Sequence, residues 1–403
     1  MQPTFCEAKI MFDVIVVGAR CAGSPTAMTL ARAGFRVLLV DRAGFPSDTL
    51  STHLVHQPGV AALARWGLLD RVIESGCPAL DQVHYEVEDV RLTGCGRGVE
   101  GQRAAYAPRR QVLDSILLDG AIAAGVEFRE RHTVTGVLRD ETGRVVGVEG
   151  THRGGTFSER AALVIGADGM RSRIADLCDA SFTRRKPRLT CAYYAYWDDL
   201  PAGLELYERP GSWVAAVPTN DGATLVLTYF PQDRFDEVRV DLERAYHEQI
   251  RTTAPALFER MRGKRQLERL RGTGDQQNFF RQASGPGWAL VGDAGHHKDS
   301  ITARGISDAF FQVESLMRHI GKDLGDPAHV DEALAGYAAE RDRALLGGFE
   351  ATLNVARLEV HQERLALLRA VRQDEELTTT YFDLVAGVGS FEALYTPRLM
   401  ALL

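Results

Sequence analysis

Residues 12–23 read FDVIVVGARCAG, a β-branched apolar run that passes into a turn rich in glycine. The run predicts a buried strand, and the small residues at helical spacing over 24–33 predict a helix after the turn. Gly34 ends that helix, and residues 36–40 (RVLLV) predict a second buried strand that leads into Asp41. The chain is therefore expected to begin with a βαβ unit.

The turn of this unit resembles G-x-G-x-x-G, a motif whose backbone N–H groups bind a pyrophosphate. In proteins with this motif, an acidic residue after the second strand accepts a hydrogen bond from the ribose. Arg20 replaces the middle glycine, and the motif taken alone leaves a nucleotide-free turn open. The Arg20 side chain either points away or neutralises phosphate, and Asp41 either binds ribose or caps a turn. The expected cofactor contacts are Gly18, Ala19, Arg20, Cys21, Ala22, Gly23, Asp41 and Arg42.

Two later apolar runs end in similar turns. Residues 162–165 (ALVI) lead into GADG, and residues 288–291 (WALV) lead into GDAG. Between them, residues 186–280 alternate in polarity and predict an antiparallel sheet. The aromatic residues of this segment include Tyr193, Tyr194, Tyr196, Trp197, Trp213, Tyr229 and Phe230.

Apolar residues at three- and four-residue spacing predict helices over 310–320, 332–346 and 354–371, packed beside the dinucleotide domain. We expect an α/β fold with interleaved domains. The FAD-binding domain would comprise residues 11–75, 101–185 and 281–345, the sheet domain residues 76–100 and 186–280, and a C-terminal helical region residues 346–403.

The segments VIGADGMRS (164–172) and LVGDAG (290–295) resemble the Asp-Gly and Gly-Asp motifs of single-component (group A) FAD-dependent monooxygenases. The order and spacing of the three motifs match that family over residues 11–320. The family has a fold like that of para-hydroxybenzoate hydroxylase and is related to geranylgeranyl reductases and flavin-dependent halogenases. The resemblance implies a Rossmann-like FAD-binding domain of the GR2 type, with an interleaved antiparallel-sheet substrate domain and C-terminal helices.

The resemblance also assigns roles to single residues. It implies that Asp293 accepts a hydrogen bond from the ribityl chain, that Asp168 and Gly169 support FAD and the transient nicotinamide, and that Arg110, or else Arg109, touches FAD. Residues 298–306 resemble the loop whose N–H groups face the flavin, with Ser300 in place of a proline and Ala303 in place of a glycine. Further expected contacts are Val134, Gly292, Ala303, Gly305 and Ile306.

Two histidines next to these segments, His53 and His297, are candidates for proton transfer. His53 follows the second strand, and His296 and His297 adjoin the flavin loop. No third ligand lies at a suitable spacing, so we expect no metal site, and a histidine that only forms structural hydrogen bonds is the commoner case.

The resemblance implies that NAD(P)H reduces tightly bound FAD and that O2 then supplies an oxygen atom to a small substrate, hydroxylating or epoxidising it. The aromatic-rich segment favours an aromatic or apolar substrate. A reductase of the geranylgeranyl-reductase type is the main alternative. A halogenase is disfavoured because those relatives need a lysine in the first domain, and none occurs between Lys9 and Lys186. A non-catalytic FAD-fold protein is a further alternative.

Composition agrees with a small-molecule enzyme. The 403 residues are 45% hydrophobic and 25% charged, with a net charge of −7, which disfavours a nucleic-acid partner. Apolar runs are of strand length, and residues 1–10 lack the features of a secretory signal, so we expect no membrane span and a cytoplasmic location. The six cysteines form no C-x-x-C pair and suit reduced thiols. A monomer or a homodimer is expected.

Overall fold

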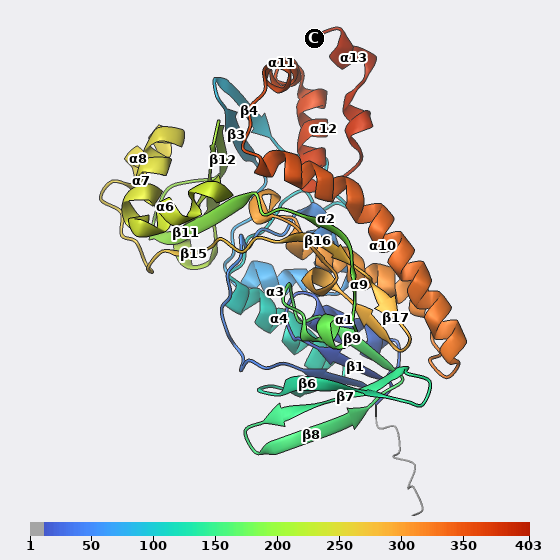
Figure 1. Cartoon of the computed structure of the whole chain (residues 1–403). Coiled ribbons are helices and arrows are strands. Elements are labelled where there is room, and N and C mark those ends of the chain that lie inside the picture. The colour runs from blue at the N-terminus through green and yellow to red at the C-terminus, as the bar shows by residue number, and fades with distance from the viewer. Residues whose placement is uncertain (1–11) are drawn as a thin grey trace, which may run out of the picture.

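The structure is a computed structural model that describes residues 12–403 (Figure 1). Residues 1–11 lie outside the described part, and with them Cys6 and the first residue of the expected FAD-binding domain. The lower half of the molecule in Figure 1 holds a mostly parallel sheet with helices, and the upper half holds a second sheet beside the C-terminal helices.

The first sheet has six strands in the order β17-β18-β9-β1-β2-β5. β1 lies at its centre, and its residues pair in parallel with β2 and with β9, so that Val14 faces Val37 on one side and Leu163 on the other. Every residue of β1, β2 and β9 is buried, as expected for a sheet covered on both faces. The bounds are β1 Val14–Val17, β2 Val37–Val40, β5 Glu127–Arg129, β9 Leu163–Gly166, β17 Ser284–Gly285 and β18 Trp288–Leu290.

Different elements cover the two faces of this sheet. Val14 and Val16 pack with α1 and α4 in one core cluster, whereas Ile15 and Val17 pack with a three-stranded sheet in another. The predicted βαβ unit is present, with its helix one residue earlier than expected. The covering elements are α1 Gly23–Arg32, α2 Gln57–Arg65, α3 Leu69–Glu74, α4 Arg110–Ala123, α5 Arg173–Leu177, β6 Thr133–Arg139, β7 Val145–His152 and β8 Gly155–Arg160.

The second large sheet has seven strands in the order β15-β11-β14-β13-β12-β3-β4. It is antiparallel, as predicted, except that β12 and β3 run parallel because β3 joins the sheet from a distant part of the chain. Helices α7 and α8 cover one face through a core cluster around Tyr246, and α6 packs on the sheet through a second cluster that holds Val238. The bounds are β3 Val83–Val87, β4 Val90–Gly94, β11 Thr190–Asp198, β12 Leu204–Arg209, β13 Ser212–Pro218, β14 Ala223–Pro231, β15 Arg271–Thr273, α6 Phe235–Val240, α7 Leu242–Thr253 and α8 Pro255–Met261.

A small sheet joins the segments between the two halves, in the order β10-β16-β19. Its strands are β10 Phe182–Lys186, β16 Asn278–Arg281 and β19 His296–His297. β19 leads into residues 298–306, named the flavin-loop segment after the loop that they resemble. Asp299 and Ser300 of this segment hydrogen-bond Thr190 of β11 and Tyr229 of β14, in the seven-stranded sheet, which is named the substrate sheet after its expected role.

The C-terminal helices correct one expectation about helix length. The predicted helix over 354–371 is interrupted, because α10 ends at Ala356 and Leu358 has a φ of 56° before α11 begins at Gln362. Residues 345 and 346 both lie in helix α10, and the division of the chain into domains stays a prediction. The bounds are α9 Gly305–Ile320, α10 Pro327–Ala356, α11 Gln362–Val371, α12 Glu375–Ala386 and α13 Pro397–Met400.

These helices do not all pack beside the dinucleotide domain. α9 and α10 do, but Leu368 of α11 and Phe382 of α12 belong to the core cluster of the substrate sheet, next to Val87 and Leu92. Figure 1 shows α11 and α12 at the top, beside β3 and β4. Helices α11 and α12 therefore cover the β3–β4 end of this sheet.

Candidate functional site

Three turns that are far apart in sequence meet at the carboxyl ends of β1, β9 and β18. Gly18 has a φ of 103°, and a Cβ there would lie 2.4 Å from the carbonyl oxygen of Ala167. A Cβ on Gly23 would lie 1.6 Å from the carbonyl oxygen of Gly18. Gly292 has a φ of 67°, and its Cβ would lie 2.7 Å from Cβ of Ala22. Glycine is therefore required at all three positions by close approach.

Backbone amides are available at this junction. α1 has ten residues and begins at the turn without a capping side chain or an acidic residue in its first turn. The Ser24 N–H donates to the Arg20 carbonyl at 3.0 Å and Pro25 has no N–H, so the backbone N–H groups without a partner within the described residues are those of residues 21–23, at the positive end of the helix dipole.

Asp41 stands beside the same turn and holds it together. One carboxylate oxygen accepts from the Ala19 N–H at 2.7 Å, and the other accepts from the Ala43 N–H at 2.7 Å. Asp41 is thus at least a turn-holding carboxylate, and the ribose contact stays a prediction. Arg42 is exposed, and Val134 is buried in the core cluster on the opposite face of the parallel sheet.

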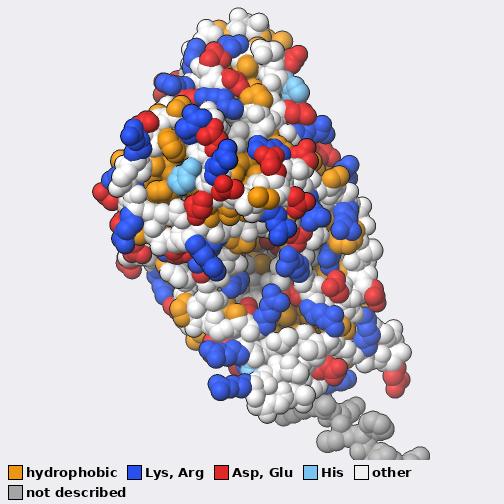
Figure 2. All heavy atoms as spheres, turned by 60° about the vertical axis from the view of Figure 1, so that its left-hand side comes forward, with side chains coloured by type: hydrophobic (Ala, Val, Ile, Leu, Met, Phe, Trp, Pro, Cys, Tyr) orange, Lys and Arg blue, Asp and Glu red, His pale blue; other side chains and the backbone are white. Residues whose placement is uncertain are grey.

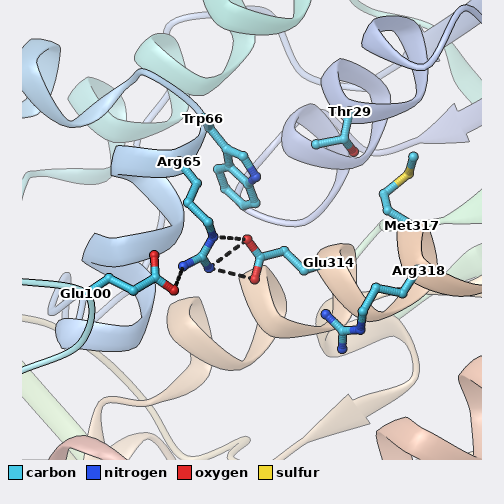
Figure 3. A pocket seen from close by; sticks show the side chains of 7 residues that line it. All are labelled: Thr29, Arg65, Trp66, Glu100, Glu314, Met317 and Arg318. Carbon is cyan, nitrogen blue, oxygen red and sulfur yellow. Dashed lines mark hydrogen bonds and ion pairs between the residues drawn. The ribbon is translucent and has the colours of Figure 1, made fainter.

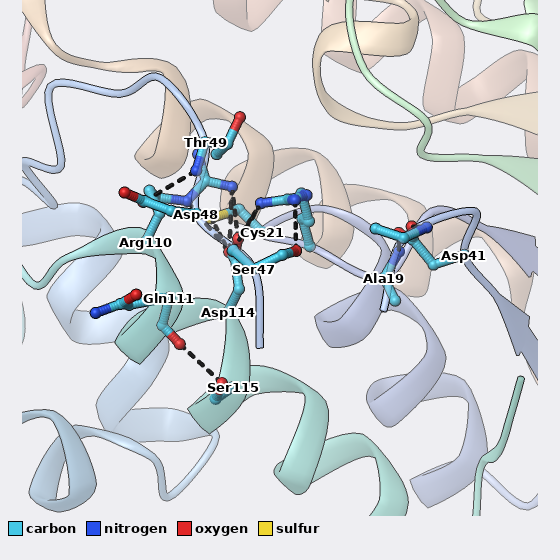
Figure 4. Close-up of polar contacts among 12 residues, drawn as sticks. Ala19, Cys21, Asp41, Ser47, Asp48, Thr49, Arg110, Gln111, Asp114 and Ser115 are labelled. Carbon is cyan, nitrogen blue, oxygen red and sulfur yellow. Dashed lines mark hydrogen bonds and ion pairs between the residues drawn. The ribbon is translucent and has the colours of Figure 1, made fainter. Parts of the chain in front are cut away.

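A buried ion cluster lies next to the turn (Figure 4). Asp114 of α4 accepts from Arg20 Nη1 at 3.0 Å, from Arg110 Nη2 at 3.1 Å and from the Cys21 thiol at 3.2 Å. The Arg20 guanidinium also donates to Ser47 Oγ at 2.9 Å. The Arg20 side chain therefore points away from the turn and toward α4, which leaves the backbone of the turn open in spite of the missing glycine.

The two neighbouring arginines lie on different sides of α4. Arg110 pairs with Asp114 beside the glycine-rich turn, whereas Arg109 pairs with Glu268 at 2.5 Å and lies over the Tyr196 ring at 4.3 Å from its centroid. Of the two, Arg110 is the one next to the expected cofactor turn. Arg109 belongs to the substrate-sheet side.

The carboxylates of the other two motifs differ in their surroundings. Asp168 accepts from Ser172 Oγ at 2.5 Å and from the Arg173 N–H at 2.7 Å, and burial raises its pKa. Asp168 therefore holds the turn before α5. Asp293 instead is exposed, and its carboxylate accepts no hydrogen bond within the described residues.

The flavin-loop segment keeps its backbone path without the family's proline and glycine. Asp299 caps the short 3-10 turn Ser300–Thr302, accepting from the Ile301 N–H at 3.1 Å. Ala303 then adopts the left-handed conformation, with a φ of 52°, and α9 begins at Gly305. Alanine supplies at some strain the conformation for which glycine is ordinarily used.

Asp299 itself is fully enclosed. It accepts from Thr190 Oγ1 at 2.7 Å, and its own N–H donates to Asn278 Oδ1 at 2.7 Å. Burial raises the pKa of Asp299 to about 6, against the opposing effect of the Thr190 hydrogen bond. A Cβ added at Gly305 would meet no atom within 4 Å, and Ile306 is buried in the core.

The two histidine candidates have different surroundings. His53 is fully buried with a φ of 62°, and its Nε2 lies 2.5 Å from the Tyr196 hydroxyl. Burial and the guanidiniums of Arg110 and Arg109 lower its pKa to about 3, so the ring is neutral. His297 hydrogen-bonds the Gln277 carbonyl and stacks on Phe279. No cluster of metal-ligating side chains occurs among residues 12–403.

Sequence reasoning missed two buried acidic residues. Asp114 follows Arg110 by four positions, so a carboxylate one helical turn after a buried arginine was the available signal. Asp308, in the first turn of α9, pairs with Lys298, and both side chains are under 8% exposed. No spacing rule identifies that pair, because the two residues meet only when the loop folds back on α9.

A surface hollow of about 480 Å3 lies away from these turns (Figure 3). Its central Arg65 donates to Glu100 at 2.6 Å and to Glu314 at 2.7 Å, so its charges are already paired. Figure 2 shows acidic and basic side chains intermixed over the upper part of the molecule. The hollow is lined by Thr29, Arg65, Trp66, Glu100, Glu314, Met317 and Arg318.

Residues 11–345 match the family model described as FAD binding domain. The chain belongs to the FAD-binding-domain family. Within this FAD-binding-domain protein, the three converging turns and the open N-terminus of α1 are observations that suit FAD, because they leave backbone N–H groups and an exposed carboxylate at one junction.

Two curated relatives of this FAD-binding-domain protein carry different activities. The digeranylgeranylglycerophospholipid reductase of Methanocella arvoryzae is 28% identical over 361 residues and 84% of each chain. The 12-dehydrotetracycline 5-monooxygenase/anhydrotetracycline 6-monooxygenase of Streptomyces rimosus is 27% identical over 82% of this chain and 66% of its own. The chain is therefore an FAD-dependent oxidoreductase.

Solved structures confirm the predicted fold class. The flavin-dependent brominase Bmp2 superposes with a TM-score of 0.82 over 97% of both chains at 17% identity. PqsL of Pseudomonas aeruginosa, a probable FAD-dependent monooxygenase, superposes with a TM-score of 0.70 over 93% of this chain and 99% of its own at 20% identity. At these identities the similarity establishes the fold alone.

Proposed function

We propose that this protein is a monooxygenase that uses FAD, NAD(P)H and O2 to hydroxylate or epoxidise a small aromatic or apolar substrate. The observation that carries the proposal is the aromatic face of the substrate sheet. Tyr194 and Tyr196 of β11 share one core cluster with Leu54 and with Ile301 of the flavin-loop segment. A flat substrate between ring and loop would lie against the flavin.

The residues of three turns would hold FAD. The N–H groups at the start of α1 would bind the pyrophosphate, Asp293 would accept from the ribityl chain, and the N-terminus of α9 would face the flavin. α9 has no capping side chain at Arg304, which leaves its first N–H groups free for that contact. Bound FAD supplies the redox chemistry and the reaction with oxygen.

The protein's own contribution is to position the substrate and exclude water. His53, Tyr194 and Tyr196 are each at most 5% exposed, so a molecule between them and the loop would be shielded from solvent. Residues 12–403 contain one glycine-rich βαβ unit, so NAD(P)H would bind transiently rather than in a domain of its own.

The deciding experiment follows the absorption spectrum of the purified protein while NADPH or NADH is added without oxygen and air is then admitted. We expect a flavin spectrum that bleaches with the reductant, and with a suitable substrate one atom of 18O2 in the product. Product formation under strict anaerobiosis, with a carbon–carbon double bond saturated, would contradict the monooxygenase.

The assignment of Asp293 has its own test. Asp293→Ala is expected to weaken FAD binding by about tenfold, because a charged hydrogen bond contributes about 1.5 kcal/mol or more. Asp236→Ala removes a surface carboxylate of α6 and serves as the control. Equal FAD dissociation constants for the two variants would show that Asp293 does not contact the cofactor.

A reductase of the geranylgeranyl-reductase type is the second candidate, favoured by the identity of the Methanocella reductase over 84% of both chains. The same anaerobic experiment separates it from the monooxygenase, since a reductase needs no O2. A halogenase has less support, because residues 12–185 contain no lysine.

We also propose a cytoplasmic protein that acts as a monomer or homodimer on a small molecule. The five described cysteines are free thiols, which suits a reducing compartment. Among the described helices, none combines the length and the apolar character needed to cross a bilayer.

A further inference from the structure

Unpartnered polar atoms gather where the substrate sheet meets the segment after β2. His53 Nδ1, the Tyr194 hydroxyl and Arg109 Nε are buried, and none of them has a hydrogen-bond partner within the described residues. The His53 and Tyr194 ring centroids lie 6.4 Å apart, and both rings flank Tyr196. A folded protein rarely leaves several such groups unsatisfied in one place, because each of them loses its hydrogen bonds to water.

The protonation state of His53 follows from its neighbours. The ring is neutral, so one nitrogen carries a hydrogen and the other accepts. The Tyr196 hydroxyl lies 2.5 Å from His53 Nε2, so we assign the donation from Tyr196 O–H to Nε2. The hydrogen of His53 is then on Nδ1. His53 and Tyr194 together present two hydrogen-bond donors without an acceptor.

The backbone of His53 is strained. A non-glycine residue with a φ of 62° costs free energy, and the His53 N–H is held there by Ser51 Oγ at 3.0 Å. This conformation keeps the imidazole against Tyr196 rather than in solvent.

Charges around the two donors nearly balance. Each nearby guanidinium is paired with a carboxylate. Arg271 pairs with Asp48 at 2.8 Å, Arg109 with Glu268 at 2.5 Å, and Arg110 with Asp114 at 3.1 Å. A neutral acceptor group suits this setting better than a charged one, because the guanidiniums already have carboxylate partners.

We propose that His53 Nδ1–H and the Tyr194 hydroxyl are specificity-determining donors that hold a carbonyl or hydroxyl oxygen of the substrate. The substrate class is thus a flat apolar molecule with one neutral oxygen, directed toward the segment after β2. This inference rests on the proposed function, because it assumes that the substrate lies between the sheet and the flavin loop.

The test uses the FAD-loaded protein and a matched pair of probes, 1-indanone and indane, which differ by one carbonyl oxygen. Binding is measured by the difference spectrum of the flavin. Wild type is expected to bind 1-indanone at least about tenfold more tightly than indane, because a site built to donate hydrogen bonds rejects an analogue without the acceptor. Equal affinity for the two probes, or no binding of either, would overturn the proposal.

Tyr194→Phe separates a ligand role from a structural one. It is expected to remove most of the preference for 1-indanone while the urea midpoint of the protein does not fall, because the lost hydroxyl has no partner in the fold. Tyr246→Phe is the matched control, since that hydroxyl is buried, donates to the Val226 carbonyl at 3.0 Å and lies on the opposite face of the sheet. The control is expected to lower the urea midpoint and to keep the preference.

His53→Gly tests the second donor, because glycine accepts the φ of 62° and removes only the imidazole. It is expected to lose the preference as Tyr194→Phe does. A preference kept in both variants, or a urea midpoint that falls in Tyr194→Phe as it does in Tyr246→Phe, would contradict the proposal. Neither readout uses NAD(P)H or O2, so a preference that persists in a protein without oxygenase activity would refute the proposed function and leave this site standing.

Discussion

The segments that follow β1 and β2 leave neighbouring strands of one sheet but pack in different ways, the first through backbone contacts and the second through side chains. After β1, residues 18–23 bring backbone to backbone, with a Cβ on Gly23 excluded by 1.6 Å. After β2, residues 41–56 bury polar side chains such as His53 and His56 instead. A place where backbones touch needs glycine and can be recognised in a sequence. A place where side chains meet distant partners has no such pattern.

Gly23→Ala should produce the largest effect on the first of these segments. The added Cβ cannot move aside, because the atom it meets is the Gly18 carbonyl oxygen, so we expect a loss of more than about 3 kcal/mol of unfolding free energy and of FAD retention. Urea unfolding and the flavin content after gel filtration measure both. Gly347→Ala, in α10 with open space at its Cα, should instead be neutral or stabilising. A normal FAD content in Gly23→Ala would show that the turn is less tightly packed than described.

Asp114→Asn should have the next largest effect on stability, because it leaves Arg20 and Arg110 beside the turn without their buried carboxylate partner. We expect a loss of about 3 kcal/mol in unfolding free energy, measured with urea, together with weaker FAD binding. Asp119→Asn, in the same helix, removes the exposed partner of Arg71 and should cost less than about 1 kcal/mol. Equal losses of unfolding free energy in the two variants would mean that burial of the Asp114 ion cluster adds nothing to stability.

Asp299→Asn should change how stability depends on pH. Since burial raises the pKa of Asp299 to about 6, the protonated form is favoured in the folded protein. Its stabilising contribution is complete below the ordinary pKa near 3.8 and is lost as the pH rises through about 6. Relative to the variant, wild type should lose on the order of 2 kcal/mol between pH 4 and pH 7, measured by urea unfolding. A constant difference over that range would place the carboxyl in a less buried setting.

Ala303→Gly should have the smallest effect and sharpen the comparison at the flavin loop. Glycine removes the strain of a φ of 52°, so we expect a gain of up to about 1 kcal/mol in unfolding free energy. Ala351→Gly, on the exposed side of α10, should lose about 1 kcal/mol. If Ala303→Gly loses as much as this control, the left-handed conformation at residue 303 is not what the protein adopts.

The same difference between backbone and side-chain packing explains which single residues can be assigned from the sequence. The turns at 18–23 and 292–295 were placed from sequence because glycine, strand length and order along the chain are local properties. The sequence leaves the direction of the Arg20 side chain open, since it depends on Asp114, which lies 94 residues away. Arg109 and Arg110 could not be told apart, because only the path of α4 decides which of them meets the glycine-rich turn.

The amino-acid sequence by itself determined the fold class, the FAD family and the three turns, because buried parallel strands and close backbone approach restrict residue type at each position. The tertiary structure alone decided which side chains share a site. It packed α11 and α12 onto the substrate sheet, and it brought His53 from the segment after β2 against Tyr194 and Tyr196 of β11. Such contacts arise from how distant segments pack, and burial assigns them no fixed spacing along the chain.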